Sequence, residues 1–345
     1  MNCHLLVPNL FWPASAGAGP YLERALPGLE TLFARGRRER EAGCSMERWL
    51  AREFALEAGE ELPLAPFALR ADGVDPGPHW WIGADPVHLK VHGARLILAD
   101  ASRFSITQRE ADELVAALNA HFATRDITFL APRPQRWYAR TSESPPARMS
   151  PTAEVAGMPV ESFLPAGKAG ARWRAIINEA QMLLHEHRCN AQREARGELA
   201  VNSVWPWGGG RAPARVPAAP YGAVWADHPL AAGLATASGA EVHALPASGE
   251  ALVAGVAAAA RDRACLAVIN VPPATAYGDI EAWREAALAL EQHWLAPLLR
   301  AVHAGALEAI TLHALGRDFA YRVAYARRDR LRFWRILRPL PAYLG

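Results

Sequence analysis

A run of three glycines next to an arginine is the feature of this chain that most directly suggests chemistry. Residues 177–213 read as a helix, then a short apolar strand that ends in Trp-Pro-Trp and the glycines. Such a strand would present backbone amides at its carboxyl end, the edge at which open α/β sheets bind ligands. Because amide and guanidinium N–H groups favour anions, we predict a ligand site there. Its candidate residues are Asn202, Trp207, Gly208, Gly209, Gly210, Arg211 and Arg136.

The same glycines also fit a tight turn that binds nothing. Other polar groups have structural explanations as well. His185 and His187 are two residues apart on a predicted helix, so they point to different faces, and we expect a surface or capping role. His88 and His92 share one face of a predicted strand near Asp85, and a structural role is the usual one for such a pair.

Arginines interleave with apolar side chains near the end of the chain. Alternation there predicts an edge hairpin of residues 321–326 and 331–337, with Leu331, Phe333 and Ile336 inward and the arginines outward. An anion-binding or nucleic-acid-binding face is the alternative. The arginines are Arg327, Arg328, Arg330, Arg332, Arg335 and Arg338.

The segment 177–213 resembles the central signature of the archaeal-type cofactor-independent phosphoglycerate mutases, in the alkaline phosphatase superfamily. The family's N-x-x-R phrase corresponds to Asn190 and Arg193, and its phrase A-N-apolar-W-x-x-G-x-G-x-x-P to residues 201–213. Residues 22–36, 105–111 and 136–138 resemble further marks of the family in order and distance. The chain is most similar to a group of uncharacterised bacterial proteins labelled as regulatory, of the E type, from clusters that regulate pathogenicity factors.

The resemblance implies an alkaline-phosphatase-like α/β fold with a three-layer core. The core would take residues 1–75 and 150–345, and an inserted α+β domain would take residues 76–149. Periodicity predicts strands at residues 4–7, 87–91, 95–99, 127–130, 136–139, 265–271 and 309–313, and helices at residues 22–35, 46–57, 107–121 and 280–302. Thr107 and Glu110 have the spacing of a helix capping box.

The resemblance also implies metal chemistry whose residues this chain lacks. Members of the family hold two divalent metals with Asp and His at strand ends and use them to activate a Ser or Thr nucleophile. In this chain the first strand end reads Pro8-Asn9, the serine position corresponds to Ala51, and the metal loop after the fourth core strand reads VPPATAY at residues 271–277. The last metal loop keeps at most His313. We therefore expect no catalytic residue of the family, no metal and no cofactor.

Length and composition limit the classes of protein to which this chain can belong. A chain of 345 residues with 51% hydrophobic residues can bury a large core. No apolar run reaches the roughly 18 residues that span a bilayer, and no basic region precedes the short apolar stretch at the start, so we expect a cytoplasmic protein with no membrane partner. The net charge of +2 predicts no nucleic-acid partner. Four scattered cysteines without a C-x-x-C pair argue against zinc clusters.

These observations favour a catalytically degenerate protein that resembles phosphoglycerate mutases and acts by binding or regulation. Its partner would be an anionic small molecule or another protein. The alternative is an active mutase or phosphatase-like metalloenzyme, or an enzyme with replaced chemistry built on His313, Asp279 and Asp318.

Overall fold

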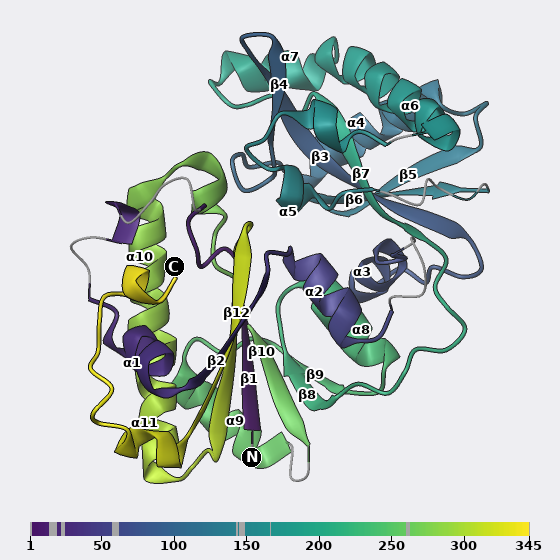
Figure 1. Ribbon diagram of the computed structural model, residues 1–345. Helices are drawn as coiled ribbons and strands as arrows, with labels where there is room; N and C mark the ends of the chain where they lie inside the picture. The colour runs from purple at the N-terminus through teal and green to yellow at the C-terminus, as the bar shows by residue number, and fades with distance from the viewer. Residues whose placement is uncertain are drawn as a thin grey trace. The chain divides into compact units, whose positions relative to one another are not determined.

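The computed structural model describes residues 2–13, 19–21, 25–56, 62–142, 144, 149–165, 167–259 and 263–344. The chain divides into two compact units (Figure 1). Unit 1 consists of Met1–Leu50 and Ala218–Gly345, and unit 2 consists of Ala51–Pro217. The boundary falls within helix α2 (Met46–Glu53). Among the described residues, no helix is both long enough and apolar enough to cross a bilayer.

Unit 1 is built on a seven-stranded sheet in the order β2-β12-β11-β1-β10-β8-β9. The five strands from β11 to β9 are parallel, while β12 and β2 add an antiparallel edge. The strands are β1 (Asn2–Val7), β2 (Arg37–Ala42), β8 (Tyr221–Trp225), β9 (Glu241–His243), β10 (Ala264–Val268), β11 (Ala309–Ala314) and β12 (Phe319–Ala326).

Helices cover both faces of this sheet. Cys3, Leu5 and Val7 of β1 point into the main hydrophobic core, on one face of the sheet. Several helices cover the core on this face. These helices are α1 (Pro27–Arg35), α9 (Gly249–Ala259), α10 (Ile280–Leu290) and α11 (Ala296–Ala304), with a π-helical turn at Glu291–Leu295. Helix α8 (Pro229–Ala237) lies on the opposite face (Figure 1). Alternation along β1 turns His4 and Leu6 toward that second face.

Unit 2 contains an antiparallel sheet in the order β4-β3-β6-β5, with β7 paired to β3. Its strands are β3 (Trp80–His92), β4 (Arg95–Ala99), β5 (Ile127–Arg133), β6 (Arg136–Thr141) and β7 (Ser203–Gly210). Its helices are α3 (Ala65–Ala71), α4 (Gln108–His121), α5 (Thr152–Val155), α6 (Gly167–His185) and α7 (Arg188–Ala195). One sheet face, which includes Ile82 and Trp137, packs on α4 and α6.

Several sequence predictions are confirmed. Thr107 is the N-cap of α4, and both hydrogen bonds of its capping box with Glu110 are present. His187 caps α7, because its Nδ1 accepts from the Cys189 amide at 3.2 Å. The predicted helix of residues 280–302 is formed by α10, the π turn and α11. Residues 22–24, the start of the predicted first helix, lie outside the described residues.

Two predictions about local structure are wrong. Residues 331–337 do not form a second hairpin strand; β12 is followed by the 3-10 helix η6 (Arg327–Leu331), and Leu331, Phe333 and Ile336 are exposed. The glycines 208–210 are also no loop after a strand, since they are the last residues of β7. Pairing of β7 with β3, a contact distant in sequence, extends this strand through the glycines.

The two units also differ from the predicted division of the chain. The predicted insertion, residues 76–149, lies within unit 2, but unit 2 further includes the signature segment. The reason is again strand pairing, because β7 of that segment joins the same sheet as β3 and β6.

Candidate functional site

The glycines of β7 allow another segment to pack closely against the strand. A Cβ added at Gly210 would lie 2.4 Å from the Pro63 Cβ, and one at Gly208 would lie 3.0 Å from the Leu64 Cβ. Gly208 has a φ of 58°, which a side chain would strain. Gly209 lies between them and is buried. The space beside these glycines is therefore filled by the residues that lead into α3.

Trp207 depends on a glycine in the neighbouring strand. A Cβ on Gly83 would lie 2.3 Å from the Trp207 indole ring, so the ring occupies the place of the missing side chain. The buried indole Nε1 makes no hydrogen bond of standard length and angle within the described residues, but it lies close enough to Asp85 to lower the pKa of that carboxyl group.

The two signature asparagines serve the backbone. Asn202 accepts a hydrogen bond from the Leu89 amide at 2.7 Å and donates to the Leu89 carbonyl at 3.0 Å. Asn190 does the same for other segments, since it accepts from the Val201 amide and donates to the carbonyls of Leu184 and Val201. Both side-chain amides stabilise the connection between α7 and β7, and Asn202 is occupied by this role.

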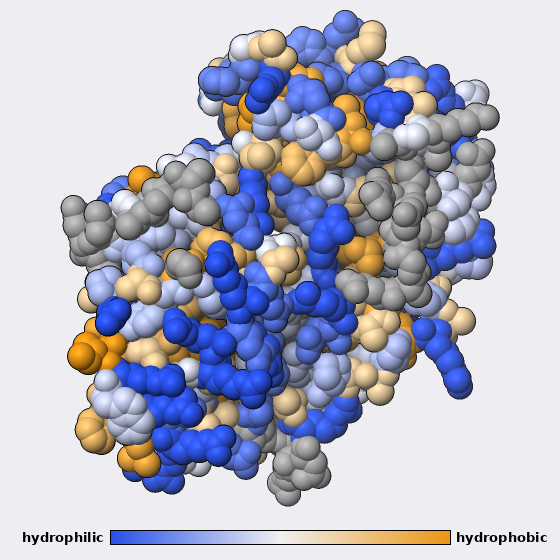
Figure 2. Space-filling model, viewed as in Figure 1, coloured by the Kyte–Doolittle hydropathy of each residue, from blue (hydrophilic) through white to orange (hydrophobic). Residues whose placement is uncertain are grey.

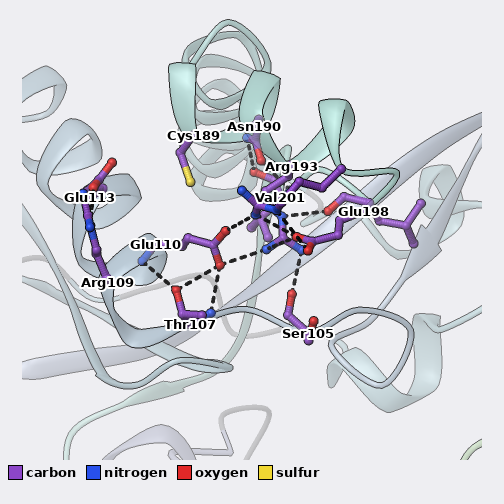
Figure 3. Close-up of polar contacts among 12 residues, drawn as sticks. Ser105, Thr107, Arg109, Glu110, Glu113, Cys189, Asn190, Arg193, Glu198 and Val201 are labelled. Atoms are coloured by element: carbon purple, nitrogen blue, oxygen red, sulfur yellow. Dashed lines mark hydrogen bonds and ion pairs between the residues drawn. The ribbon is translucent and has the colours of Figure 1, made fainter.

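Arg193, the arginine of the signature, is only 1% exposed and is surrounded by acceptors (Figure 3). Its Nε donates to the Leu199 carbonyl at 2.9 Å, and its Nη2 to the Ser105 carbonyl at 2.6 Å. Its Nη1 donates to the Glu110 carboxylate at 3.1 Å. Since Glu110 also belongs to the capping box of α4, Arg193 links α4 and α7 to the segment that leads into β7. This guanidinium is a structural centre of unit 2.

A second charged group surrounds Asp72, the residue after α3, whose side chain is 2% exposed. Arg136 donates from two nitrogens to its carboxylate, the Tyr138 hydroxyl donates to Oδ2 at 2.8 Å, and Arg133 Nε lies 3.7 Å from Oδ1. The hydrogen bond to Asp72 raises the pKa of Arg136, and burial raises the pKa of Tyr138. These four residues are called the Asp72 cluster below.

Asp85 of β3 lies close enough to Arg136 and Tyr138 to affect the pKa of each. Thr152 Oγ1 donates to its Oδ2 at 2.6 Å. Burial raises the pKa of Asp85 to about 6, although the Thr152 hydrogen bond opposes this rise. A carboxyl group with a pKa in this range beside an arginine is a frequent property of functional sites, and of structural networks too.

Arg136 and Arg211 are placed by opposite ends of α3. Asp72 follows the helix and binds Arg136, whereas Pro63 precedes the helix and packs on Gly210, the neighbour of Arg211. Seven helical residues at 1.5 Å each separate these ends by about 10 Å. Arg211 is exposed, and its guanidinium lies 4.6 Å from the centre of the Trp80 ring. The predicted ligand residues are thus divided between two places.

In unit 1, the carboxyl ends of the central strands carry few groups that could hold a metal. Asn9 follows β1 with a φ of 58°, and its Nδ2 donates to the Val271 carbonyl at 3.1 Å. Asp279 is the N-cap of α10 and accepts from the Ala282 amide at 3.0 Å. Ala51, at the expected nucleophile position, is the first residue of unit 2 and is buried. Throughout the described residues, no three His, Cys, Asp or Glu side chains are grouped as metal ligands.

His313 of β11 pairs with His4 of β1. Their rings are stacked, with His4 Nδ1 3.0 Å from His313 Nε2, and Tyr221 lies edge-on to His4. Burial, with a smaller effect of Arg322, lowers the pKa of His4 to about 4. At neutral pH His4 is therefore uncharged, and one of its ring nitrogens can accept a hydrogen bond.

The chain is distantly related to phosphoglycerate mutases that do not depend on 2,3-bisphosphoglycerate. It is 28% identical to the enzyme of Methanosarcina barkeri over 122 residues. These residues make up 35% of this chain and 31% of the enzyme. The chain is 26% identical over 129 residues to the probable enzyme of Geobacter sulfurreducens, 37% of this chain and 32% of that protein. The matched region thus spans about a third of these relatives. No family model matches the chain.

One solved structure with a similar fold comes from Pyrococcus horikoshii. A Pyrococcus horikoshii protein superposes with a TM-score of 0.54 at 14% identity, over 94% of this chain and 87% of that one. The cofactor-independent phosphoglycerate mutase of Thermoplasma acidophilum gives a TM-score of 0.43 at 16% identity, over 100% of this chain and 94% of that one. The two sheets with their helices confirm the predicted α/β class, and the likeness to the Pyrococcus protein shows that the fold is shared.

Sequence reasoning did not select Asp72, Asp85 or Tyr138 for the candidate site. Asp72 lies in a stretch rich in Gly and Pro, where no periodicity shows that its carboxylate is buried. The sequence does contain a signal for Tyr138. Arg136 and Tyr138 are two residues apart on a predicted strand, so their side chains lie on the same face.

Proposed function

We propose that this chain is a protein related to phosphoglycerate mutases that has lost phosphoryl transfer and acts by binding an anionic small molecule, in a regulatory role. The regulatory E-type group that the sequence resembles fits this proposal. The observation that carries it is the chemistry of the strand ends in unit 1. Asn9 and the apolar residues Val271 and Ala314 stand where a two-metal phosphotransferase needs carboxylates and histidines.

The missing groups matter because phosphoryl transfer depends on charge stabilisation. Two divalent ions activate the nucleophile and neutralise the charge that develops on the phosphoryl oxygens. Ala51 supplies no oxygen nucleophile, and Asn9 is an amide already bonded to a backbone carbonyl. A scaffold with these substitutions retains its fold and its surfaces for binding. It lacks the nucleophile and the metal ligands that phosphoryl transfer requires.

The ligand contact that we propose is the exposed side of the Asp72 cluster. Arg133 and Arg136 flank the β5–β6 turn, with side chains 59% and 38% exposed. Two guanidinium groups share one carboxylate, so the cluster has a net positive charge and free N–H groups for a phosphate or carboxylate. Arg211 provides a separate exposed guanidinium. Asn202 and the β7 glycines support the site through packing and backbone hydrogen bonds.

Thermal unfolding in the presence of 3-phosphoglycerate tests the proposal. We expect the ligand to raise the melting temperature, with stabilisation of about 2.7 kcal/mol at a hundredfold excess over the dissociation constant. Arg133→Ala should reduce the rise while leaving the ligand-free melting temperature unchanged. Arg109→Ala is the matched control, since Arg109 is 88% exposed on α4. An equal rise in wild type and Arg133→Ala would exclude this contact.

Metal analysis of the purified protein tests the loss of chemistry. We expect no stoichiometric pair of manganese or zinc ions. Two tightly bound ions per chain would contradict the proposal and favour the alternative, an active metalloenzyme.

A further inference from the structure

The segment after β12 exposes an unusual set of apolar side chains. Phe333 and Ile336 are each 76% exposed, Trp334 is 66% exposed and Leu331 is 60% exposed. Among the described residues of the chain, these are four of the ten large hydrophobic side chains that are exposed, and they fall within six positions. Scattered single residues of this kind are ordinary, but a concentration of them indicates an interaction surface.

The backbone of this segment is anchored, so the exposure is built into the fold. Arg332 Nη1 donates to the Arg35 carbonyl at 2.7 Å and lies 3.1 Å from the Asp329 carboxylate. The buried Asp329 in turn accepts from the Ala326 amide at 2.9 Å. Farther along, the Arg338 amide donates to the Tyr343 hydroxyl at 2.8 Å, and Leu340 is buried in the main core. Residues between these anchors are held outward.

Positive charge surrounds the same side chains. Residues 327–338 contain six arginines and one aspartate, a net charge of +5, whereas the whole chain carries +2, so the remainder carries −3. Arg328, Arg330 and Arg338 are exposed. In Figure 2, strongly hydrophilic and hydrophobic atoms alternate at the lower left, where Figure 1 draws this segment in yellow. The C-terminal surface is defined here as Leu331, Phe333, Trp334, Ile336, Arg328, Arg330 and Arg338.

We infer that the C-terminal surface docks the protein onto an anionic lipid membrane. Protruding aromatic and aliphatic side chains can sink below the headgroups while arginines stay at the phosphates. A second copy of the chain is a poor occupant, because a symmetric contact would bring two segments of charge +5 together. Nucleic acid would contact the arginines through its phosphates but would not bury the aliphatic side chains. The expectation of no membrane partner rests on the lack of a long apolar run, which concerns spanning a bilayer; docking at the bilayer surface needs no such run.

Flotation with lipid vesicles tests this inference. Vesicles of phosphatidylcholine and phosphatidylserine in equal parts should bind the protein about a hundredfold more tightly than pure phosphatidylcholine, as three arginines near an anionic surface would give. Raised salt should weaken the binding. The triple variant Arg328→Glu, Arg330→Glu and Arg338→Glu should lose it. A control with the same charge change, Arg95→Glu, Arg215→Glu and Arg263→Glu, alters exposed arginines elsewhere and should retain most of it.

The apolar part of the surface is tested separately. Phe333→Ser with Trp334→Ser should reduce vesicle binding about tenfold or more while leaving the melting temperature unchanged, because both side chains are exposed. No flotation with either vesicle would overturn the inference, and so would equal binding to both vesicles. Unchanged binding by the double serine variant would point to a purely electrostatic partner such as nucleic acid or an acidic protein, and would also overturn it.

Discussion

Asp72 has a structural role at the scale of single residues, and it also orients the arginines of the proposed ligand contact. Its carboxylate is buried, yet it holds two arginines at an exposed turn. Arg136 makes the close contacts and Arg133 the distant one. Arg136 is therefore the main partner of the Asp72 carboxylate, and the exposed guanidinium of Arg133 is the more available of the two for a ligand.

Replacement of Arg136 should therefore affect stability more than replacement of Arg133. Arg136→Ala leaves a buried carboxylate with only the Tyr138 hydroxyl and a distant arginine, and we expect a loss of about 2 kcal/mol in the free energy of unfolding. Arg133→Ala should cost at most about 0.5 kcal/mol. Urea denaturation of both variants measures the difference. Equal losses would show that the two arginines share Asp72 evenly.

Asp85 should make stability depend on pH. Its pKa is raised to about 6 in the folded state, above the value near 4 of an unfolded chain. The folded state therefore binds the proton more tightly, and this contribution to stability is complete below about pH 4 and is lost as the pH rises through 6.

The variant Asp85→Asn removes this titration while its amide oxygen can still accept from Thr152. We expect the stability of the variant relative to wild type to increase from pH 4 to pH 7, with an upper limit of about 3 kcal/mol, since one pKa unit corresponds to about 1.4 kcal/mol. Denaturation midpoints of both proteins across this range provide the measurement. A constant difference would mean that Asp85 has an ordinary pKa.

At the scale of elements, β7 and α3 are fitted to each other through glycines. Gly210→Ala would force the new Cβ against Pro63, and we expect a loss of about 1 to 3 kcal/mol from overpacking. Gly255→Ala in α9 is the control, because its new Cβ would lie at an ordinary contact distance of 3.5 Å from the Trp225 indole. Helix propensity should make that variant more stable by about 0.5 to 1 kcal/mol. Thermal denaturation compares the two, and a stabilised Gly210→Ala would contradict the packing role.

Local signals in the sequence were sufficient for some elements and not for others. The capping box at Thr107 and the helices of residues 280–302 depend on neighbouring residues, so spacing alone predicts them. Whether the β7 glycines form a strand or a turn depends on their pairing with β3, more than a hundred residues earlier in the chain. Alternation around Phe333 predicts a strand, but hydrogen bonds from Arg332 and Arg335 to carbonyls at the end of α1 hold this segment in a different path. Such tertiary contacts leave no local signal.

For the whole molecule, we propose that an α/β scaffold distantly related to phosphoglycerate mutases has lost metal catalysis at its strand ends. Fold and function separate readily, since chemistry resides in a few side chains at a site. The signature residues Asn190, Arg193 and Asn202 are retained here in structural roles. Their presence accounts for the resemblance in sequence without requiring an active site.

The most direct test of this account is a turnover measurement. Purified protein is incubated with 3-phosphoglycerate and either manganese or magnesium, and formation of 2-phosphoglycerate is followed. The account predicts no conversion above the rate without protein. Conversion that is abolished by a chelator and restored by manganese would contradict it.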